Sequence, residues 1–338
     1  MSSSDTAWLI EQAKTLGFAL CGVVRAEKFP ELERTAEWLA RGYAGEMNYL
    51  ADARRSDLKA AMPGVRSVIV CLLHYNTAHP LSTESSITAG DAEPRGWISR
   101  YAWGDDYHRV LRKKLDTLIE ALHRRFPGPF EARSYVDTGP VQERILAKYA
   151  GLGWLGKNTL LLHPALGSYF FLGVILTSLE LTPTVGAQEL PPPDLCGNCR
   201  QCLDACPTQA FVGPYVLDAR KCISYLTIEL RGAIPELLRE SVGNHVFGCD
   251  ICQDVCPWNA RAPVSAAPEF QPRVFSSPYE ISMQAGAPRK EESLLLPRLE
   301  WLAGLTEAQF QHHFCGSAIR RTKWRGLVRN ACVALGNA

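Results

Sequence analysis

Hydrophobic residues in the first half of this chain switch between two spacings, one typical of strands and one typical of helices. Residues 17–24 predict a strand, and the nearly continuous apolar run at residues 67–75 predicts another that is covered on both faces. Over residues 105–125, apolar side chains fall on one helical stripe behind an aspartate, which predicts a capped amphipathic helix. A further strand is expected at residues 132–136, directly before Asp137.

The remaining elements of this half continue the alternation. We expect helices at residues 5–16 with Asp5 as the N-cap, at 30–52 and at about 141–150, and two strands within 158–181. Strands that alternate with helices predict a layered α/β, or α+β, domain over residues 1–185.

Prolines separate this domain from the rest of the chain. Pro183 and the run at residues 191–193 mark a boundary. Residues 186–262 are expected to form a second domain that holds most of the cysteines. Residues 263–338 are expected to begin as an irregular segment and to end as a helical, repeat-like region.

Composition narrows the class of protein. Hydrophobic residues make up 46% of the chain, which excludes a mainly disordered protein. A net charge of +1 excludes a globally basic nucleic-acid binder and permits only a local basic patch. The first residues lack a basic stretch leading into an apolar one, and the most apolar run, residues 169–177, is too short to span a bilayer. We expect a soluble cytoplasmic protein that does not contact a membrane, and we expect a monomer.

Cysteine is the residue type that carries chemical information. Eight of the twelve cysteines lie within 61 residues, and in a reducing cytoplasm such a group indicates metal binding rather than disulfides. The first segment has the spacing of bacterial 4Fe-4S ferredoxins, and the second is a shorter version of it. The two segments are Cys196-x2-Cys199-x2-Cys202-x3-Cys206-Pro207 and Cys249-x2-Cys252-x3-Cys256-Pro257.

In the ferredoxin pattern the cysteine before the proline binds the neighbouring cluster, so we expect the two ligand sets to cross. The first 4Fe-4S cluster is then bound by Cys196, Cys199, Cys202 and Cys256. The second is bound by Cys206, Cys249 and Cys252, with Cys222 as the nearby thiol that completes the set. Zinc, which paired Cys-x2-Cys motifs often hold, is the alternative. Small buried hydrophobes are expected at the other four: Cys21, Cys71, Cys315 and Cys332.

Three polar stretches lie at the ends of predicted elements in the first domain: Arg100–His108, Asp137–Arg144 and Gly151–Asn158. Asp137 follows a strand and precedes a helix, a position at which ligands bind in open α/β sheets. A carboxyl group there can donate a proton if burial raises its pKa. The alternative is that Asp137 caps the following helix. The glycines of 151–156 follow a helix rather than a strand, so they do not make a dinucleotide-binding motif.

Together with the cysteine segments, these stretches resemble the epoxyqueuosine reductase family. The similarity runs in order from about residue 5 to the end of the chain and includes Cys222–Glu229 and Cys249–Asn259. The resemblance implies an N-terminal cobalamin-binding α/β domain, a ferredoxin-like module with two 4Fe-4S clusters and a C-terminal helical segment. It also implies reduction of epoxyqueuosine to queuosine at the wobble base of tRNA, the last step of queuosine biosynthesis, with electrons from an external low-potential donor.

The same resemblance assigns roles to individual residues. Asp137 matches the family's proton donor and is the expected catalytic residue. Electrons would pass through the clusters to cobalamin, whose reduced cobalt acts on the epoxide. The corrin is expected to contact Arg55, Tyr101, Asp137, Lys157, Ser224 and Asp250. Solvated surface charge is the alternative for Arg55 and Lys157, and the stretch at residues 54–58 lacks a proline that the family pattern has.

The C-terminal region carries a local excess of positive charge, because no Asp or Glu occurs from residue 308 onward. Positions 321, 325 and 329 are four apart and would share one helix face, which could follow a phosphate backbone. An ordinary solvated helix face is the alternative, and the resemblance favours tRNA. The expected tRNA contacts are Arg320, Arg321, Lys323, Arg325 and Arg329. A base splayed into the site could stack on an aromatic side chain, and the candidates, each with core packing as its alternative, are Trp103, Tyr107 and Tyr225.

Two other functions fit parts of the sequence. A reductive dehalogenase acting on a small molecule would share the cobalamin and cluster modules. Members of that family usually carry an export signal that this chain lacks, and the basic C-terminal stretch would have no role. A simple iron–sulfur electron carrier would leave the first 185 residues without a purpose.

Overall fold

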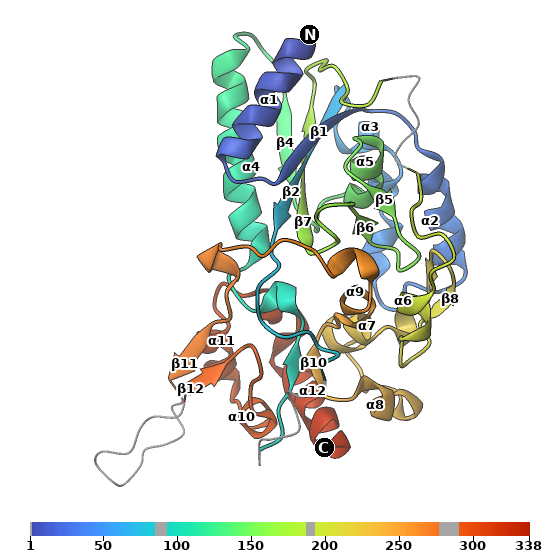
Figure 1. Cartoon of the computed structure of the whole chain (residues 1–338), viewed down its shortest axis with the longest axis vertical. Coiled ribbons are helices and arrows are strands. Elements are labelled where there is room, and N and C mark those ends of the chain that lie inside the picture. The colour runs from blue at the N-terminus through green and yellow to red at the C-terminus, as the bar shows by residue number, and fades with distance from the viewer. Residues whose placement is uncertain (1, 85–92, 187–192, 277–290) are drawn as a thin grey trace.

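The computed structural model describes residues 2–84, 93–186, 193–276 and 291–338. The described elements form an elongated molecule with the N-terminus at one end and the C-terminus at the other (Figure 1). A four-stranded sheet occupies the half that holds the N-terminus. Short helices and two-stranded ribbons make up most of the other half.

The sheet contains β1 (Leu20–Arg25), β2 (Ser67–His74), β4 (Ala132–Tyr135) and β7 (Phe170–Thr177), in the order β1-β2-β7-β4. All three neighbouring pairs are antiparallel. The strands expected at 67–75 and 132–136 are confirmed, and β2 is buried over nearly its whole length, as its apolar sequence predicts. The fold is therefore a mixed α/β layer structure whose sheet is antiparallel.

Helices cover both faces of this sheet (Figure 1). One face packs against α1 (Ser3–Thr15) and α4 (Tyr107–Arg125), which share a core with Ile69 and Ile175 of the strands. The opposite face packs against α2 (Pro30–Ala40), α3 (Leu58–Ala61) and α5 (Glu143–Tyr149). Two buried faces explain why the central strands are apolar at almost every position.

The first residues of the helices follow their capping chemistry. The Asp106 carboxylate accepts a hydrogen bond from the His108 backbone N–H (3.0 Å), which confirms an aspartate cap for α4. The prediction that Asp5 is the N-cap of α1 is wrong. That helix starts earlier, Ser2 is its N-cap, and the Asp5 carboxylate closes a capping box by accepting from the Ser2 backbone N–H (3.1 Å). The helix expected at 30–52 is also too long, because α2 ends at Ala40.

The cysteine-bearing segment is built from short elements. The ribbon β5 (Trp154–Leu155) and β6 (Leu161–Leu162) precedes it. It contains α6 (Gln201–Asp204), β8 (Phe211–Gly213), β9 (Val216–Leu217), α7 (Ile223–Ile228), α8 (Glu236–Val242), β10 (His245–Phe247) and α9 (Ile251–Asp254). The C-terminal segment adds β11 (Val274–Ser276), β12 (Glu291–Ser293), α10 (Leu299–Ala303), α11 (Glu307–His313) and α12 (Lys323–Asn337).

The segments that the sequence divides at residues 185 and 262 share their cores. β3 (Trp97–Ile98) pairs in parallel with β10. Trp97 and Trp103 pack in one apolar cluster with α10 and α12. The polar stretch that follows β3 is thereby fixed between the sheet domain and the cysteine-bearing segment. Over the part of the chain that the structure describes, no helix is both long and apolar enough to cross a membrane.

Candidate functional site

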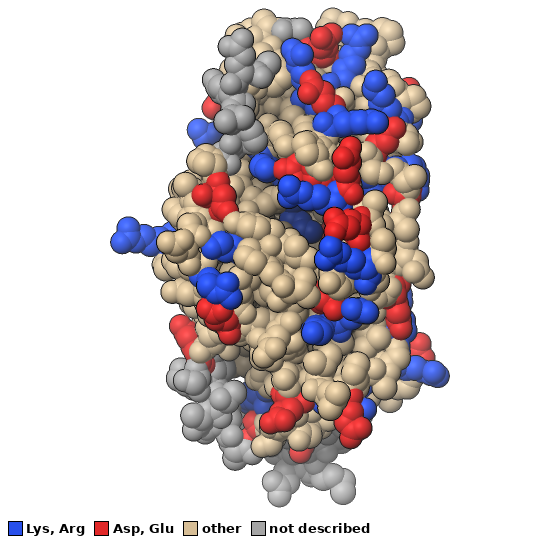
Figure 2. Space-filling model, turned by 90° about the vertical axis from the view of Figure 1, so that its right-hand side faces the viewer, with Lys and Arg blue, Asp and Glu red and all other residues tan. Residues whose placement is uncertain are grey.

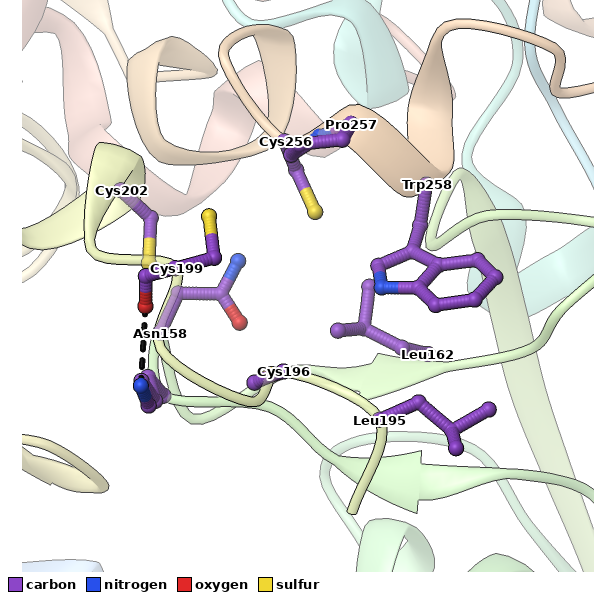
Figure 3. A pocket seen from close by; sticks show the side chains of 10 residues that line it. Asn158, Leu162, Leu195, Cys196, Cys199, Cys202, Cys256, Pro257 and Trp258 are labelled. Atoms are coloured by element: carbon purple, nitrogen blue, oxygen red, sulfur yellow. Dashed lines mark hydrogen bonds between the residues drawn. The ribbon is translucent and has the colours of Figure 1, made fainter.

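Four cysteines from two distant segments surround one cavity of about 240 Å³. Figure 3 shows the thiols of Cys199 and Cys202 facing that of Cys256 across this space. The lining residues are Lys157, Asn158, Leu162, Leu195, Cys196, Cys199, Cys202, Cys256, Pro257 and Trp258. The structure therefore brings together the four residues of the first expected ligand set, including the one that crosses from the second segment.

The backbone of the first cysteine loop is held in place by its neighbours. Gly197 adopts φ +48°, which lets the chain turn tightly after Cys196. The Lys157 ammonium donates to the carbonyl oxygens of Gly197 and Cys199 (the latter 2.9 Å), and the Trp154 indole donates to Cys196 Sγ (3.5 Å). Lys157, expected at the corrin, thus lies against the loop of the first cysteine set.

The charges of these thiols fit a cationic cluster. Burial and the neighbouring thiols raise the pKa of Cys202 to about 11. Four neighbouring thiols all become thiolates only when bound metal supplies positive charge. Among the described residues, no three His, Cys, Asp or Glu side chains come close enough to hold a single metal ion. Thiols that surround a cavity, rather than converge on a point, fit an iron–sulfur cluster better than zinc.

The second expected set also lies together. Burial raises the pKa of Cys222, and the charge of Cys206 adds to this effect. Burial raises the pKa of Cys249 and Cys252 still further, and the charge of Cys222 also raises the pKa of both thiols. Cys222 directly precedes α7. The structure therefore brings this residue, 27 positions before Cys249, to the other three members of its set.

The four remaining cysteines divide into two kinds. Cys21 and Cys71 are buried partners in the β1–β2 register, with their Sγ atoms 3.7 Å apart, as expected for small core residues. The expectation is wrong for Cys315 and Cys332, which are exposed. Cys332 lies on the solvent side of α12, because the core side of that helix is taken by Leu327 and Ala331.

Asp137 lies just beyond the end of β4, with an unusual backbone and an accessible side chain. Its φ is +55° and its side chain is 62% exposed. The Tyr107 hydroxyl donates to Asp137 Oδ2 (2.9 Å), and His108 Nε2 lies 3.4 Å from the same oxygen. α5 has Gln142 as its N-cap, so Asp137 does not cap that helix. The carboxylate is therefore free to act in chemistry rather than in helix capping.

The proton distribution at this site differs from the simple expectation for a buried acid. The surrounding protein partly desolvates Asp137, although its side chain stays open to solvent, and this tends to raise its pKa. The close approach and charge of His108 and the hydrogen bond from Tyr107 outweigh this effect, so the pKa is lowered. For His108, burial tends to lower the pKa, but the carboxylates of Asp106 and Asp137 raise it to about 9. In this structure the proton at neutral pH therefore lies on the imidazole and not on Asp137.

Two further ionisable residues lie beside Asp137. Burial, followed by the charge of Asp137, raises the pKa of Glu143 to about 8, and Glu143 Oε1 is buried without a hydrogen-bond partner among the described residues. Desolvation lowers the pKa of Arg144, which donates to the carbonyl of Thr159. Sequence reasoning gave His108 and Glu143 no individual role. The sequence feature that could have identified them is their position in the two polar stretches at the starts of α4 and α5.

The residues expected at the corrin are spread around Asp137. Arg55 donates to the Val141 carbonyl on the chain that follows Asp137 (3.4 Å). The Tyr101 ring packs edge-on against Tyr107 (5.8 Å) and contacts Phe247, two residues before Cys249. Ser224 lies on α7, two residues after Cys222. These three connect the surroundings of Asp137 with the second cysteine set.

Asp250 does not present its side chain to this region. It is 1% exposed, and its carboxylate accepts hydrogen bonds from Trp97 Nε1 (3.1 Å), the Ser99 hydroxyl and the Arg100 backbone N–H (2.8 Å). The side chain is occupied by the hydrogen-bond donors around β3, and the expected cofactor contact of this residue stays a prediction. Asp250 instead fixes the chain that leads into Tyr101.

The expected basic stripe does not form. Arg320 and Arg321 belong to a 3-10 turn (Ala318–Thr322), and Lys323 at φ +64° separates that turn from the rest of α12. Positions 321, 325 and 329 therefore do not share one helix face. Figure 2 shows basic and acidic side chains interleaved over one face of the molecule, in keeping with the net charge of +1.

The five basic residues have different surroundings. Arg329 donates to the carbonyls of Leu226 (2.7 Å), Leu230 (2.8 Å) and Gly232, so its guanidinium ties α12 to α7. Arg321 forms a two-pronged pair with Glu229 (2.9 and 3.0 Å), and Arg320 donates to Gln311 (2.9 Å). Lys323 and Arg325 are exposed. The aromatic candidates Trp103 and Tyr225 are buried in the core, whereas Tyr107 lies beside Asp137.

Known proteins resemble this chain at both of these sites. Residues 55–138 match the family model described as epoxyqueuosine reductase QueG, DUF1730, and residues 195–259 match a 4Fe-4S double cluster binding domain. The epoxyqueuosine reductase of Gloeobacter violaceus is 44% identical, over 98% of this chain and 95% of its own length. That of Pseudomonas aeruginosa is 42% identical, over the whole of this chain and 88% of its own.

Solved structures agree with the sequence relatives. A crystal structure of epoxyqueuosine reductase with a tRNA-Tyr epoxyqueuosine-modified tRNA stem loop has a TM-score of 0.83 and 32% identity, over 99% of this chain and 81% of that one. A structure of the Bacillus subtilis enzyme, with an aspartate-bearing catalytic loop swung out of the active site, has a TM-score of 0.82 and 31% identity, over 99% and 82%. With this identity over nearly its full length, the chain belongs to the epoxyqueuosine reductase family.

Proposed function

We propose that this chain reduces the epoxide of epoxyqueuosine in tRNA to the alkene of queuosine. Its membership of the family and the near-complete coverage of its relatives support this activity. The observation that carries the proposal is the setting of Asp137, an accessible carboxylate that connects through Tyr107 and Tyr101 to the chain before Cys249. An acid is required at this point because the epoxide oxygen leaves as water.

Electrons enter through iron–sulfur clusters, which the double-cluster domain at residues 195–259 binds. In the proposed assignment, Cys196, Cys199, Cys202 and Cys256 bind one cluster. Cys206, Cys222, Cys249 and Cys252 bind the other. Because Phe247 contacts Tyr101, which packs on Tyr107, the second set is connected to the Asp137 site by packing. An external low-potential donor would supply the electrons.

Cobalamin is the second cofactor of this proposal. The residues around Asp137 fit a large polar ligand, because Glu143 Oε1 is buried without a partner in the described part of the chain and Asp137 is open. Arg55, Tyr101 and Ser224 are positioned to contact it, and Lys157 would act from the first cysteine loop. When bound, reduced cobalamin supplies electrons to the epoxide carbon.

Asp137 delivers the proton to the epoxide oxygen. Tyr107 orients the carboxylate through its hydroxyl, and the Tyr107 ring is itself fixed by stacking on Phe171 (4.4 Å, 2° between the planes). A substrate that covers Asp137 would remove water from the carboxylate and raise its pKa, which favours the protonated donor. The swung-out aspartate loop of the Bacillus subtilis relative supports a loop that can move out of the active site.

tRNA is the proposed substrate, supported by the relative solved with an epoxyqueuosine-modified stem loop. The exposed Lys323 and Arg325 and the partly engaged Arg320 are the proposed backbone contacts. Arg321 would act beside the Asp137 site, where its charge lowers the pKa of that carboxyl. Arg329 would act by holding α12 in place. The proposal also includes a monomer working in the cytoplasm.

Replacement of Asp137 tests this function. The Asp137→Asn variant keeps the size of the side chain and removes its acidic group, so turnover of an epoxyqueuosine-modified stem loop should fall about 10²–10⁴-fold. Iron content and cobalamin binding should not change. The matched control is Asp116→Asn, an exposed aspartate on α4 that bonds only to Ser134 in the described contacts. Wild-type turnover in Asp137→Asn would remove this residue from the mechanism.

A further inference from the structure

The proposed reaction, on which this inference rests, needs more protons than one carboxyl group can hold. Conversion of an epoxide to an alkene and water breaks two C–O bonds and forms one C=C bond. It consumes two electrons and two protons for each oxygen removed. The clusters and their donor supply the electrons. Asp137 holds at most one proton, so the second must reach the departing oxygen from another group.

His108 is the neighbour of Asp137 with a defined path to it. Its Nε2 lies 3.4 Å from Asp137 Oδ2, and its Nδ1 lies 2.8 Å from Asp106 Oδ1. Nε2 is buried and has no hydrogen bond of good geometry within the described residues. The imidazole is also stacked on the Tyr107 ring (4.1 Å), which limits its rotation. Among the described residues, Asp137 is therefore the group to which Nε2 can pass a proton.

We propose that His108 is a positioning residue that recharges Asp137 with the second proton of each turnover. In the first transfer, the Asp137 O–H bond breaks and an O–H bond forms on the opened epoxide oxygen. The His108 Nε2–H bond then breaks and a new O–H bond forms on Asp137. This proton is passed to the hydroxyl group as it leaves as water. After product release, solvent returns both protons through the exposed Asp137: the first passes on to the neutral imidazole, and the second stays on Asp137 as the next substrate covers it and raises its pKa.

The charges around His108 support this role. At neutral pH the imidazole carries a proton, because the carboxylates at both ring nitrogens outweigh burial and raise its pKa to about 9. The opened oxygen is already a hydroxyl group when this proton arrives, and the proton lets it leave as water, a far weaker base than hydroxide. Several other titratable or charged groups face the His108–Asp137 pair from the elements packed around it. Those of α4 and its cap are Asp106, Tyr107 and Arg109. The others are Glu143 and Arg144 of α5, Tyr49, Tyr101 and Arg321.

Glu143 is the competing proton source. Its pKa is raised to about 8, first by burial and then by the charge of Asp137, so it also holds a proton at neutral pH. Neither Glu143 Oε1 nor His108 Nε2 has a hydrogen-bond partner among the described residues, but Nε2 lies 3.4 Å from the reacting oxygen, Asp137 Oδ2. The geometry therefore favours His108. If His108 is the source, the dependence of the rate on pH should change in a His108 variant. If Glu143 is the source, it should change in a Glu143 variant, so one experiment separates the two.

The test is a single-turnover measurement between pH 6 and 10, with the cofactor-loaded, pre-reduced protein and an epoxyqueuosine-modified stem loop. The wild-type rate should fall above about pH 9, where His108 loses its proton. His108→Gln should be slowed about 10²-fold or more and should lose this dependence, and added imidazole should restore part of the rate. His123→Gln, at the exposed far end of the same helix, is the matched control and should behave as wild type.

A second variant covers the case in which His108→Gln does not fold. Asp106→Asn keeps an N-cap for α4 but removes the negative charge beside Nδ1. The alkaline fall in rate should then shift towards pH 6.5, the ordinary value for histidine. A wild-type pH profile in both variants, or loss of the alkaline fall in Glu143→Gln instead, would overturn the role of His108. Absence of turnover in the wild-type protein would instead refute the proposed function.

Discussion

The crossed assignment of the cysteines can be tested by pairs of substitutions. Cys256 belongs to the second sequence segment but lies in the wall of the cavity formed by the first. Serine is a poor replacement for a thiolate ligand of iron–sulfur clusters. Two 4Fe-4S clusters hold eight irons, so Cys256→Ser should leave about four irons per chain, those of the second cluster.

Double variants separate the crossed arrangement from a local one. Cys196→Ser with Cys256→Ser changes two ligands of one cluster, and about four irons should remain. Cys249→Ser with Cys256→Ser changes one ligand of each cluster, so the iron content should fall towards zero. If each segment bound its own cluster, the two results would be exchanged.

The assay is iron and sulfide analysis after anaerobic purification, together with electron paramagnetic resonance of the reduced protein. Cys315→Ser is the matched control, because Cys315 is exposed and lies outside both sets. That variant should retain about eight irons, the number that two 4Fe-4S clusters hold. The crossed assignment would be refuted if Cys249→Ser with Cys256→Ser retained one intact cluster.

Two predictions concern stability. Arg329→Ala removes the donors for the carbonyls of Leu226, Leu230 and Gly232, so the free energy of unfolding in urea should fall by about 2–4 kcal/mol, against less than about 0.5 kcal/mol for the exposed Arg325→Ala. Equal effects of the two variants would show that Arg329 has no structural role. Glu31 has a lowered pKa, because hydrogen bonds from Lys148 (2.6 Å) and Tyr149 (2.9 Å) outweigh the raising effect of burial. A carboxyl group whose pKa is lowered by folding stabilises the fold at pH values above its ordinary pKa. This stabilisation is lost as the pH falls through the pKa of the folded state. Glu31→Gln should therefore cost about 1 kcal/mol at pH 7, and this difference from wild type should shrink below about pH 4 in pH-dependent urea titrations; a difference that is constant with pH would contradict the ion pair.

The long periodic elements could be predicted because their signal is local. The apolar stripe of α4 indicates one buried face and the apolar run of β2 indicates burial on both faces, and both elements were located to within about two residues. The direction of the strands could not be obtained in this way. An apolar strand has the same sequence pattern in a parallel or an antiparallel sheet, and only the path of the intervening chain decides which one forms.

Whether a single side chain is exposed or buried was harder to predict from the sequence. Cys332 and Arg329 lie on the same short helix, yet the cysteine is exposed and the arginine binds three backbone carbonyls of other segments. Asp250, expected at the cofactor, is buried beneath β3. Residue type gives an average tendency to be buried, whereas the partner that satisfies a polar group comes from distant chain.

The sequence by itself determined the clustering of eight cysteines, from which the two ligand sets are predicted, and the position of Asp137 at the end of a strand. Most ligands of each predicted set follow short spacings along one loop, and such spacings are fixed by the chain itself. Only the tertiary structure decided the protonation of the site. His108 and Tyr107 are about 30 residues from Asp137 and reach it because α4 packs across the sheet beside β7 and β4. The pKa of a carboxyl group depends on the charges and donors within a few ångströms, and those are set by packing rather than by neighbours in sequence.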